Sequence, residues 1–169
     1  CIRDRALDAA TEGFQKALKE KLGDKVEFDV QNAQGEETNC ATIATKFVNS
    51  NVDLIMANAT QAVISSATAT SDIPIVGTSV TDYVTTGTVK SNDAPGGNVT
   101  GTSDLAPIDQ QVELLQKLVP DAKNVGILYC SAEANSVYQA EQAEKYLEKA
   151  GITAKTYTAA DSNLSLIHI

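Results

Sequence analysis

The chain has 169 residues and a formal net charge of −9, with 22 acidic residues against 13 lysines and arginines. Binding to nucleic acid requires clustered positive charge, so an acidic chain without a basic patch argues against a nucleic-acid partner. No apolar run approaches the ~18 residues that a membrane-spanning helix needs.

The two ends of the chain look foreign to the rest. Residues 164–169 read Leu-Ser-Leu-Ile-His-Ile, and one DNA sequence that encodes them has a complementary strand that encodes residues 1–5. That DNA resembles the transposon end used to build sequencing libraries. We therefore interpret residues 1–5 and 164–169 as adaptor-derived and residues 6–163 as native. The alternative is coincidence, and the codons at the two ends decide between them.

Without these ends the chain has neither histidine nor arginine, because His168, Arg3 and Arg5 are the only ones. This removes most general-base, metal-ligand and guanidinium chemistry, so we expect no catalytic residue, no metal and no cofactor. Cys40 and Cys130 are far apart and form no CxxC pair, which predicts buried free thiols.

The first part of the chain alternates between helical and extended patterns. Apolar residues at helical spacing predict a helix over 6–22, and the alternation of Val26, Phe28 and Val30 predicts an edge strand over 25–31. The further expected elements are a helix over 36–48, a strand over 53–57, a helix over 60–70, a strand over 73–77, an ambiguous segment over 83–90, a turn over 93–97 and a strand over 98–103.

A boundary is expected at residues 104–107, where Pro107 precedes a new helix. The elements expected after it are a helix over 107–119, a strand over 125–129, a helix over 134–150 and a strand over 152–157. Alternating strands and helices predict an α/β fold with parallel sheets. The native piece starts on a helix and ends on a strand, so we expect it to be cut from a longer chain.

Three of the buried strands run into short polar loops. Ligands of open parallel sheets lie in the crevice outside the carboxyl ends of the strands, so these loops are the candidate binding residues. They are Asn58, Ala59 and Thr60 after the strand over 53–57, Ser79, Thr81 and Asp82 after the strand over 73–77, and Ser131, Glu133, Asn135 and Ser136 after the strand over 125–129.

The chemistry of these loops suits a small zwitterion. Backbone N–H groups of residues 58–60 at a helix start favour a carboxylate, as do the hydroxyls of Ser79 and Thr81, and Asp82 suits an ammonium group. A structural role is the alternative for each set. Residues 58–60 then only cap a helix, Asp82 forms a capping turn, and residues 131–136 are a capping cluster.

Several short segments match one protein family in order and wording. The most specific is Pro95-Gly96-Gly97-Asn98-Val99-Thr100-Gly101. The others are Asp53–Ile55, Ile73–Val76, Thr81–Asp82, Lys117–Pro120, Asn124–Tyr129 and Ala134–Ser136. Together they resemble bacterial ABC-transporter substrate-binding proteins, in the branch that includes tryptophan-binding and other amino-acid-binding lipoproteins.

The resemblance implies the type I periplasmic-binding fold, with two Rossmann-like lobes whose parallel sheets are flanked by helices. Residues 6–103 are then lobe one without its first strand, and residues 104–163 are the start of lobe two. It also implies a solute-binding component of an ABC importer, lipid-anchored in the periplasm or outside the cell. Such a protein binds a small amino acid or related solute between the lobes and meets a membrane permease.

Two other classes of protein remain as alternatives. An effector-binding domain of a LacI-like transcriptional regulator has the same two-lobe fold, and it requires a basic helix-turn-helix ahead of residue 6. A Rossmann-type enzyme requires a phosphate loop, a nucleophile–base pair or a metal site. The Gly96-Gly97-Asn98 cluster is a turn without the GxGxxG order or the lysine of a phosphate loop. We therefore expect a protein that is not an enzyme.

Overall fold

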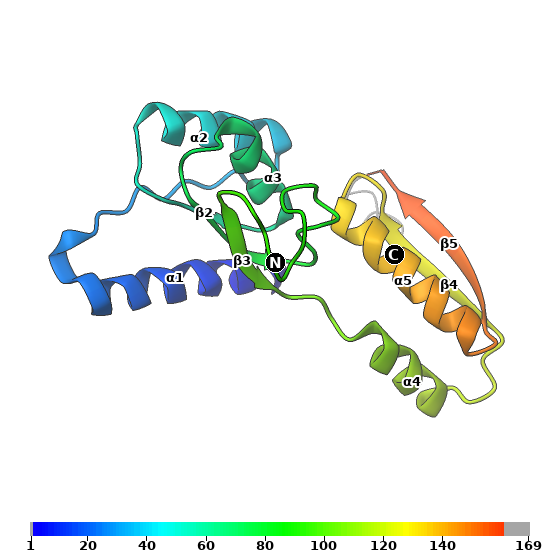
Figure 1. Cartoon of the computed structure of the whole chain (residues 1–169). Helices are drawn as coiled ribbons and strands as arrows, with labels where there is room; N and C mark the ends of the chain where they lie inside the picture. The colour runs from blue at the N-terminus through cyan, green and yellow to red at the C-terminus, as the bar shows by residue number, and fades with distance from the viewer. Residues whose placement is uncertain (1, 161–169) are drawn as a thin grey trace. The chain divides into compact units, whose positions relative to one another are not determined.

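The computed structural model describes residues 2–160, with side chains from residue 7 onward. The chain divides into two units, residues 1–104 and 105–169, and each is considered by itself. Figure 1 shows the helices and strands of both units from the N-terminal helix in blue to the last strand in red. The segment expected to be adaptor-derived at 164–169 lies outside the described residues.

The first unit is built on a parallel sheet with strand order β1-β2-β3. The strands are β1 (Ile55–Asn58), β2 (Ile75–Val80) and β3 (Val99–Ser103). Ile75 of β2 pairs with Ile55 on one side and with Val99 on the other. The prediction of a parallel sheet that contains the strand over 73–77 is confirmed, although β2 begins at Ile75 and runs on to Val80. All three carboxyl ends therefore meet at one edge of the sheet.

Three helices accompany this sheet, and they are α1 (Ile2–Leu22), α2 (Glu37–Asn49) and α3 (Thr60–Ala69). Helix α3 packs against β1, β2 and α2 (Figure 1). Its serines allow this close approach, since Ser65 and Ser66 are buried at 8% and 5% exposure. The three predicted helices are confirmed, and the first begins at Ile2 rather than at residue 6.

The core of the first unit is made by side chains of the three strands, of α3 and of the segment after β2. Ile75, Val63 and Val80 are fully buried. The rest of the cluster is Ile55, Ala57, Tyr83, Val89 and Val99. Each fully buried aliphatic side chain stabilises the fold by about 1.5–3 kcal/mol relative to an exposed one, so this core stabilises the three strands and the helix packed on them.

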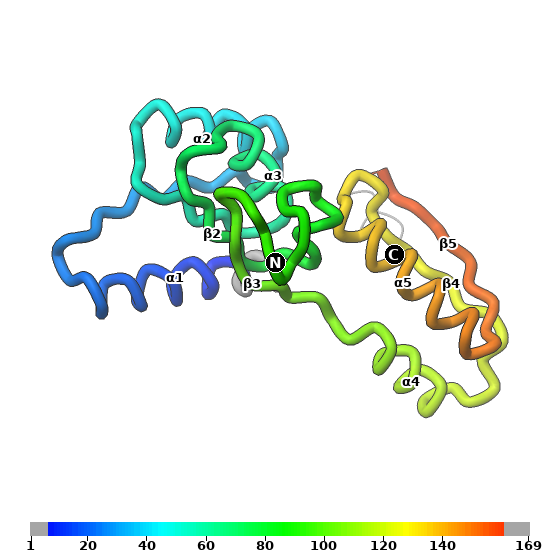
Figure 2. The backbone as a smooth tube through the Cα atoms, in the orientation of Figure 1, coloured from blue at the N-terminus to red at the C-terminus, as the bar shows by residue number. Residues whose placement is uncertain are grey.

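The predicted strand over 25–31 is wrong. A short 3-10 helix, η1 (Gly23–Lys25), follows α1, and residues 26–33 have no helix or strand. Figure 2 shows this segment as a length of tube between α1 and α2. A strand needs a neighbouring backbone for its hydrogen bonds, and the described sheet of the first unit contains only β1, β2 and β3. Instead, Asp29 pairs with Lys46 of α2 at 2.9 Å, and Val30 stays 59% exposed.

The second unit pairs β4 (Asn124–Cys130) with β5 (Thr153–Ala159) in parallel. Helices α4 (Ile108–Leu118) and α5 (Ala134–Lys149) pack on each other, and α5 packs on both strands. Val112, Leu147 and Ile152 form the core of this unit. The predicted helices and strands of this part are confirmed. Leu128 and Tyr157 pair directly across the sheet and stay 60% and 49% exposed.

Cys40 and Cys130 are free thiols, as predicted, although each is only partly buried. Burial raises the pKa of the Cys40 thiol above its ordinary value, and the nearby Glu37 carboxylate adds to this effect. A raised pKa keeps the thiol protonated and unreactive, so Cys40 behaves as part of the packing of α2.

Candidate functional site

The carboxyl ends of β1 and β2 place two of the predicted sets at one edge of the sheet. Asn58 at the end of β1 pairs with Thr78 of β2, and the Ala59 N–H donates to the Thr78 carbonyl at 3.0 Å. Residues 58–60 and 79–82 therefore lie at neighbouring strand ends. This shared edge of the first unit is hereafter the β1–β2 edge.

Ala59 makes the turn from β1 into α3 with an uncommon backbone conformation, φ 86° and ψ 157°. Because the Ala59 N–H already bonds to the sheet, the expectation that it points at a ligand is wrong. The donors at this helix start are the N–H groups of residues 60–62, which have no intrahelical partner. Thr60 is the first residue of α3, and it is 8% exposed. No side chain caps α3, so the capping alternative for Asn58 and Thr60 fails.

The Asn58 side chain connects β1 to α1. Its Nδ2 donates to the Leu7 carbonyl at 2.6 Å and to Thr11 Oγ1 at 2.9 Å. Its Oδ1 is buried and has no hydrogen-bond partner. A buried acceptor without a partner costs roughly 1–3 kcal/mol, so this oxygen is a candidate to receive an N–H group from a bound molecule.

Ser79 lies in a bulge of β2. The pairing register between β2 and β3 shifts between Gly77 and Val80, and Ser79 has φ 56°. A bulge bends its strand and turns a side chain away from the regular alternation. The chain then continues to Thr81, whose carbonyl accepts a hydrogen bond from Ser103 Oγ at 2.7 Å. Thr81 is 6% exposed, so the tip of this strand is well packed.

Asp82 organises the loop that follows β2. Its Oδ1 accepts from the Thr85 N–H at 2.6 Å and from Thr85 Oγ1 at 2.7 Å, and its Oδ2 accepts from Asn92 Nδ2 at 2.9 Å. Burial raises the pKa of Asp82, but the bonds from Thr85 and Asn92 outweigh it and lower the pKa below its ordinary value. This is the geometry of the capping-turn alternative. The Val84 N–H also bonds to this carboxylate, so its lone pairs are largely taken up by the loop itself.

The third predicted set lies in the second unit, around the start of α5. Glu133 precedes the helix without capping it, and Ser136 Oγ donates to Glu133 Oε2 at 2.9 Å. Ser131 Oγ donates to the Ala159 carbonyl of β5 at 3.2 Å. Asn135 lies in the first turn of α5. The structure therefore brings these four residues together at the carboxyl end of β4.

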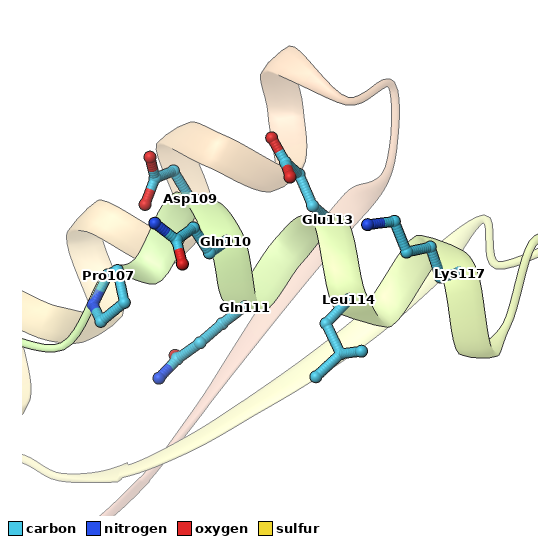
Figure 3. Close-up of a pocket in the computed structure, with 7 residues that line it drawn as sticks. All are labelled: Pro107, Asp109, Gln110, Gln111, Glu113, Leu114 and Lys117. Atoms are coloured by element: carbon cyan, nitrogen blue, oxygen red, sulfur yellow. The ribbon is translucent and has the colours of Figure 1, made fainter.

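A surface hollow that the sequence did not indicate runs along α4. Figure 3 shows its lining side chains, which come from this one helix and the proline before it. They are Pro107, Asp109, Gln110, Gln111, Glu113, Leu114 and Lys117. A binding pocket needs groups that converge from several elements, so we place the site at the strand ends and not here.

Sequence reasoning missed the residues that shape the β2 loop. Tyr83, Thr85 and Asn92 hold it together, yet residues 83–90 looked only ambiguous. The available signal was the four threonines of residues 81–88, because threonine hydroxyls commonly bond to nearby backbone in turns. Among the described residues, no group of three or more histidine, cysteine or acidic side chains is arranged to hold a metal ion. None of the described helices is long and apolar enough to cross a membrane.

A profile of the family described as ABC transporter substrate binding protein matches residues 1–166. The chain is 45% identical over 151 residues to a tyrosine-binding protein of Clostridioides difficile (strain R20291). That match covers 88% of this chain and 44% of the relative. The chain thus spans less than half the length of this curated relative.

Solved structures of other proteins also resemble this chain. A conserved domain protein from Vibrio cholerae is 40% identical with a TM-score of 0.88, over 94% of this chain and 55% of that one. An ABC domain from Streptococcus pneumoniae in complex with L-Trp is 40% identical with a TM-score of 0.87, over 93% and 54%. A leucine-binding protein from Thermotoga maritima is 20% identical with a TM-score of 0.72, over 92% and 45%, and it supports the fold alone.

Proposed function

Because the chain belongs to the family of ABC transporter substrate-binding proteins, we propose that it is part of an importer component that binds an amino acid and delivers it to an ABC permease. Proteins of this family act outside the cytoplasm, and a lipid anchor on the whole protein is part of the proposal. The observation that carries it is the 45% identity to a tyrosine-binding protein, joined by 40% identity to a domain solved with L-Trp. Both point to an L-amino acid with an aromatic side chain.

The β1–β2 edge supports this choice of ligand. The N–H groups at the start of α3 and the hydroxyls of Ser79 and Thr81 suit an α-carboxylate. The Asp82 carboxylate and the unpaired Oδ1 of Asn58 suit an α-ammonium group, since the oxygens of both side chains are hydrogen-bond acceptors. Thr60 completes the proposed set in the first unit, and Ala59 contributes the turn that places it.

The proposed binding residues of the second unit are Ser131, Glu133, Asn135 and Ser136. Their hydroxyl, amide and carboxylate groups offer both donors and acceptors to a polar ligand. Family membership favours this transport role over the LacI-like regulator, which gains no support from the relatives described above. A role in binding and delivery also requires no reaction, in keeping with the chemistry that the native residues offer.

The proposal is tested by thermal unfolding and titration calorimetry of the whole protein that the gene encodes. The probes are L-tyrosine, L-tryptophan and L-leucine, with D-tyrosine and glucose as controls. A ligand at one hundred times its Kd stabilises the native state by about 2.7 kcal/mol, which is readily seen as a rise in Tm. We expect L-tyrosine or L-tryptophan to give the largest rise and the controls to give none. Stabilisation by glucose alone, or by D-tyrosine as much as by L-tyrosine, would contradict the proposal.

A further inference from the structure

Tyr83 lies over a pair of facing glycines. Gly77 of β2 pairs directly with Gly101 of β3, and Tyr83 is 5% exposed. A Cβ atom added at Gly77 would lie 2.5 Å from Tyr83 Oη and 2.8 Å from its Cε1. A Cβ atom at Gly101 would collide with Tyr83 Oη and with the Gly77 carbonyl. The two glycines therefore leave the space that the phenol ring fills.

The polar atoms of Tyr83 join three parts of the unit. Its Oη donates to the Thr102 carbonyl of β3 at 3.1 Å. Its own carbonyl accepts from Thr86 Oγ1 at 2.7 Å and from Thr88 Oγ1 at 3.3 Å. Burial raises the pKa of the phenol, with a further rise from the Asp104 carboxylate, so the hydroxyl keeps its proton and remains a donor. Tyr83 thus attaches the start of the β2 loop both to β3 and to the following turn.

The bulge at Ser79 is held on both sides by these contacts. Below it lies the Gly77–Gly101 pair, and above it the end of β3 bonds to the end of β2. Ser103 Oγ donates to the Thr81 carbonyl at 2.7 Å, and the Asp104 N–H donates to the Val80 carbonyl at 3.0 Å. Loss of Tyr83 would remove two things at once. These are the ring that covers the glycine pair and the hydrogen bond from the loop to the Thr102 carbonyl of β3.

We propose that Tyr83 is a positioning residue for ligand binding, which holds the Ser79–Thr81 tip of β2 in its binding conformation before the ligand arrives. The inference rests on the proposed function and extends it to a residue beneath the site. A binding segment that is already ordered loses less conformational freedom when the ligand binds, and this raises affinity.

The test compares Tyr83→Phe with the wild-type protein in its whole form. This substitution removes the hydroxyl and keeps the ring, so the core stays filled. Tyr157→Phe is the matched control, because it makes the same change at a half-exposed tyrosine of the second unit. Ser103→Ala is the second variant, since it removes another bond to the β2 tip while leaving Tyr83 intact. Affinity for L-tyrosine and L-tryptophan is measured by calorimetry, and amide hydrogen exchange is measured with and without ligand.

We expect Tyr83→Phe to weaken binding about two- to tenfold, the range of one neutral hydrogen bond. Exchange should speed up at residues 79–88 in the free variant and return to the wild-type rate when ligand saturates it. Ser103→Ala should act in the same direction, and Tyr157→Phe should change nothing. Wild-type affinity and exchange in Tyr83→Phe would overturn the assignment, as would faster exchange throughout the first unit, which indicates a purely structural role. If the wild-type protein binds neither amino acid, the proposed function itself fails and this inference with it.

Discussion

Two residues at the β1–β2 edge adopt positive φ angles without being glycine. Ala59 has φ 86° with ψ 157°, and Ser79 has φ 56°. A side chain in such a conformation costs roughly 1–3 kcal/mol, and this kind of strain often accompanies binding sites. Both residues lie at the ends of strands that carry proposed ligand-binding residues. The strained backbone there places the binding groups and lowers the stability of the folded state.

The strain at Ala59 predicts that Ala59→Gly stabilises the first unit by about 1 kcal/mol, because glycine adopts this backbone without a Cβ clash. Urea unfolding gives the free energy of unfolding for the comparison. Ala41→Gly is the matched control, since Ala41 is an exposed residue inside α2 where the same change costs about 1 kcal/mol. Two variants destabilised to the same extent would show that Ala59 carries no strain.

The Gly77–Gly101 pair gives the second prediction at this scale. Gly101→Ala should destabilise the first unit by about 1–3 kcal/mol, because its Cβ meets the backbone of Gly77, which cannot move aside as a side chain can. Gly97→Ala is the control four residues earlier, where nothing lies within 4 Å of an added Cβ. We expect its effect to stay within about 0.5 kcal/mol, as for most surface substitutions. Equal effects in urea unfolding would contradict the close packing of the two strands.

Among the elements, the loop between β2 and β3 depends most on side chains for its shape. It has no regular secondary structure between Asp82 and Asn98, so its backbone groups need other partners. The Asp82 carboxylate accepts from the Thr85 backbone N–H and from the Asn92 side chain, and so it joins the two ends of the segment from Thr85 to Asn92. The ionised Asp82 side chain therefore stabilises the conformation of this loop, which lies next to the proposed site.

The lowered pKa of Asp82 makes this loop sensitive to acid. A carboxyl whose pKa is lower in the folded state contributes stability above its unfolded value of about 3.8, and this contribution is lost as the pH falls through the lower folded value. We expect the protection of the amides at residues 82–92, taken relative to the intrinsic exchange rate at each pH, to fall below about pH 3.8 in the wild-type protein. Asp82→Asn should show low protection already at neutral pH and little further loss in acid.

Asp93→Asn provides the control for this experiment. It changes the same kind of side chain in the same loop, and the Asp93 carboxylate accepts no hydrogen bond in the described part of the chain. We expect its pH dependence to follow the wild type. Asp29 also has a lowered pKa, through its bonds to Gln31 and Lys46, so the exchange must be read at residues 82–92 and not from global unfolding. Unchanged protection of the wild-type loop across this pH range would contradict the role of Asp82.

For the whole molecule, the two units have separate hydrophobic cores. The first is centred on Ile75, Val63 and Val80, and the second on Val112, Leu147 and Ile152. Residues 104–107 join the units without regular secondary structure. Domains with their own cores commonly unfold separately, so a core substitution in one unit should leave the stability of the other unchanged.

Leu147→Ala tests this independence. Leu147 is 2% exposed, and truncation of such a leucine costs about 2–5 kcal/mol. We expect amide exchange to accelerate across β4 and β5 and to stay at the wild-type rate across β1 and β2. Leu128→Ala is the matched control in the same unit, because a leucine that is 60% exposed should contribute less than about 1 kcal/mol. Acceleration in both units after Leu147→Ala would mean that they unfold as one.

Local pattern by itself determined the periodic elements. Buried β-branched runs such as Ile73–Val76 predicted the parallel strands, and amphipathic spacing predicted the helices to within a few residues at most ends. The polar loops at the ends of β1, β2 and β4 also followed from sequence, and the first two share an edge because parallel strands of one sheet end on the same side. Periodicity carries this information since it depends only on neighbouring residues.

Only the tertiary structure decided the contacts between distant segments. Residues 26–30 alternate between apolar and polar side chains as a strand does, but they form no strand. Alternation gives a segment one apolar face, and it does not provide the neighbouring backbone that a strand bonds to. Asn58 bonds to residues 47 and 51 positions away, and Asp82 to one ten positions away. The Gly77–Gly101 pair and the ring above it depend on the register between β2 and β3. Side chains far apart in sequence meet only when packing has set that register, so no local pattern predicts them.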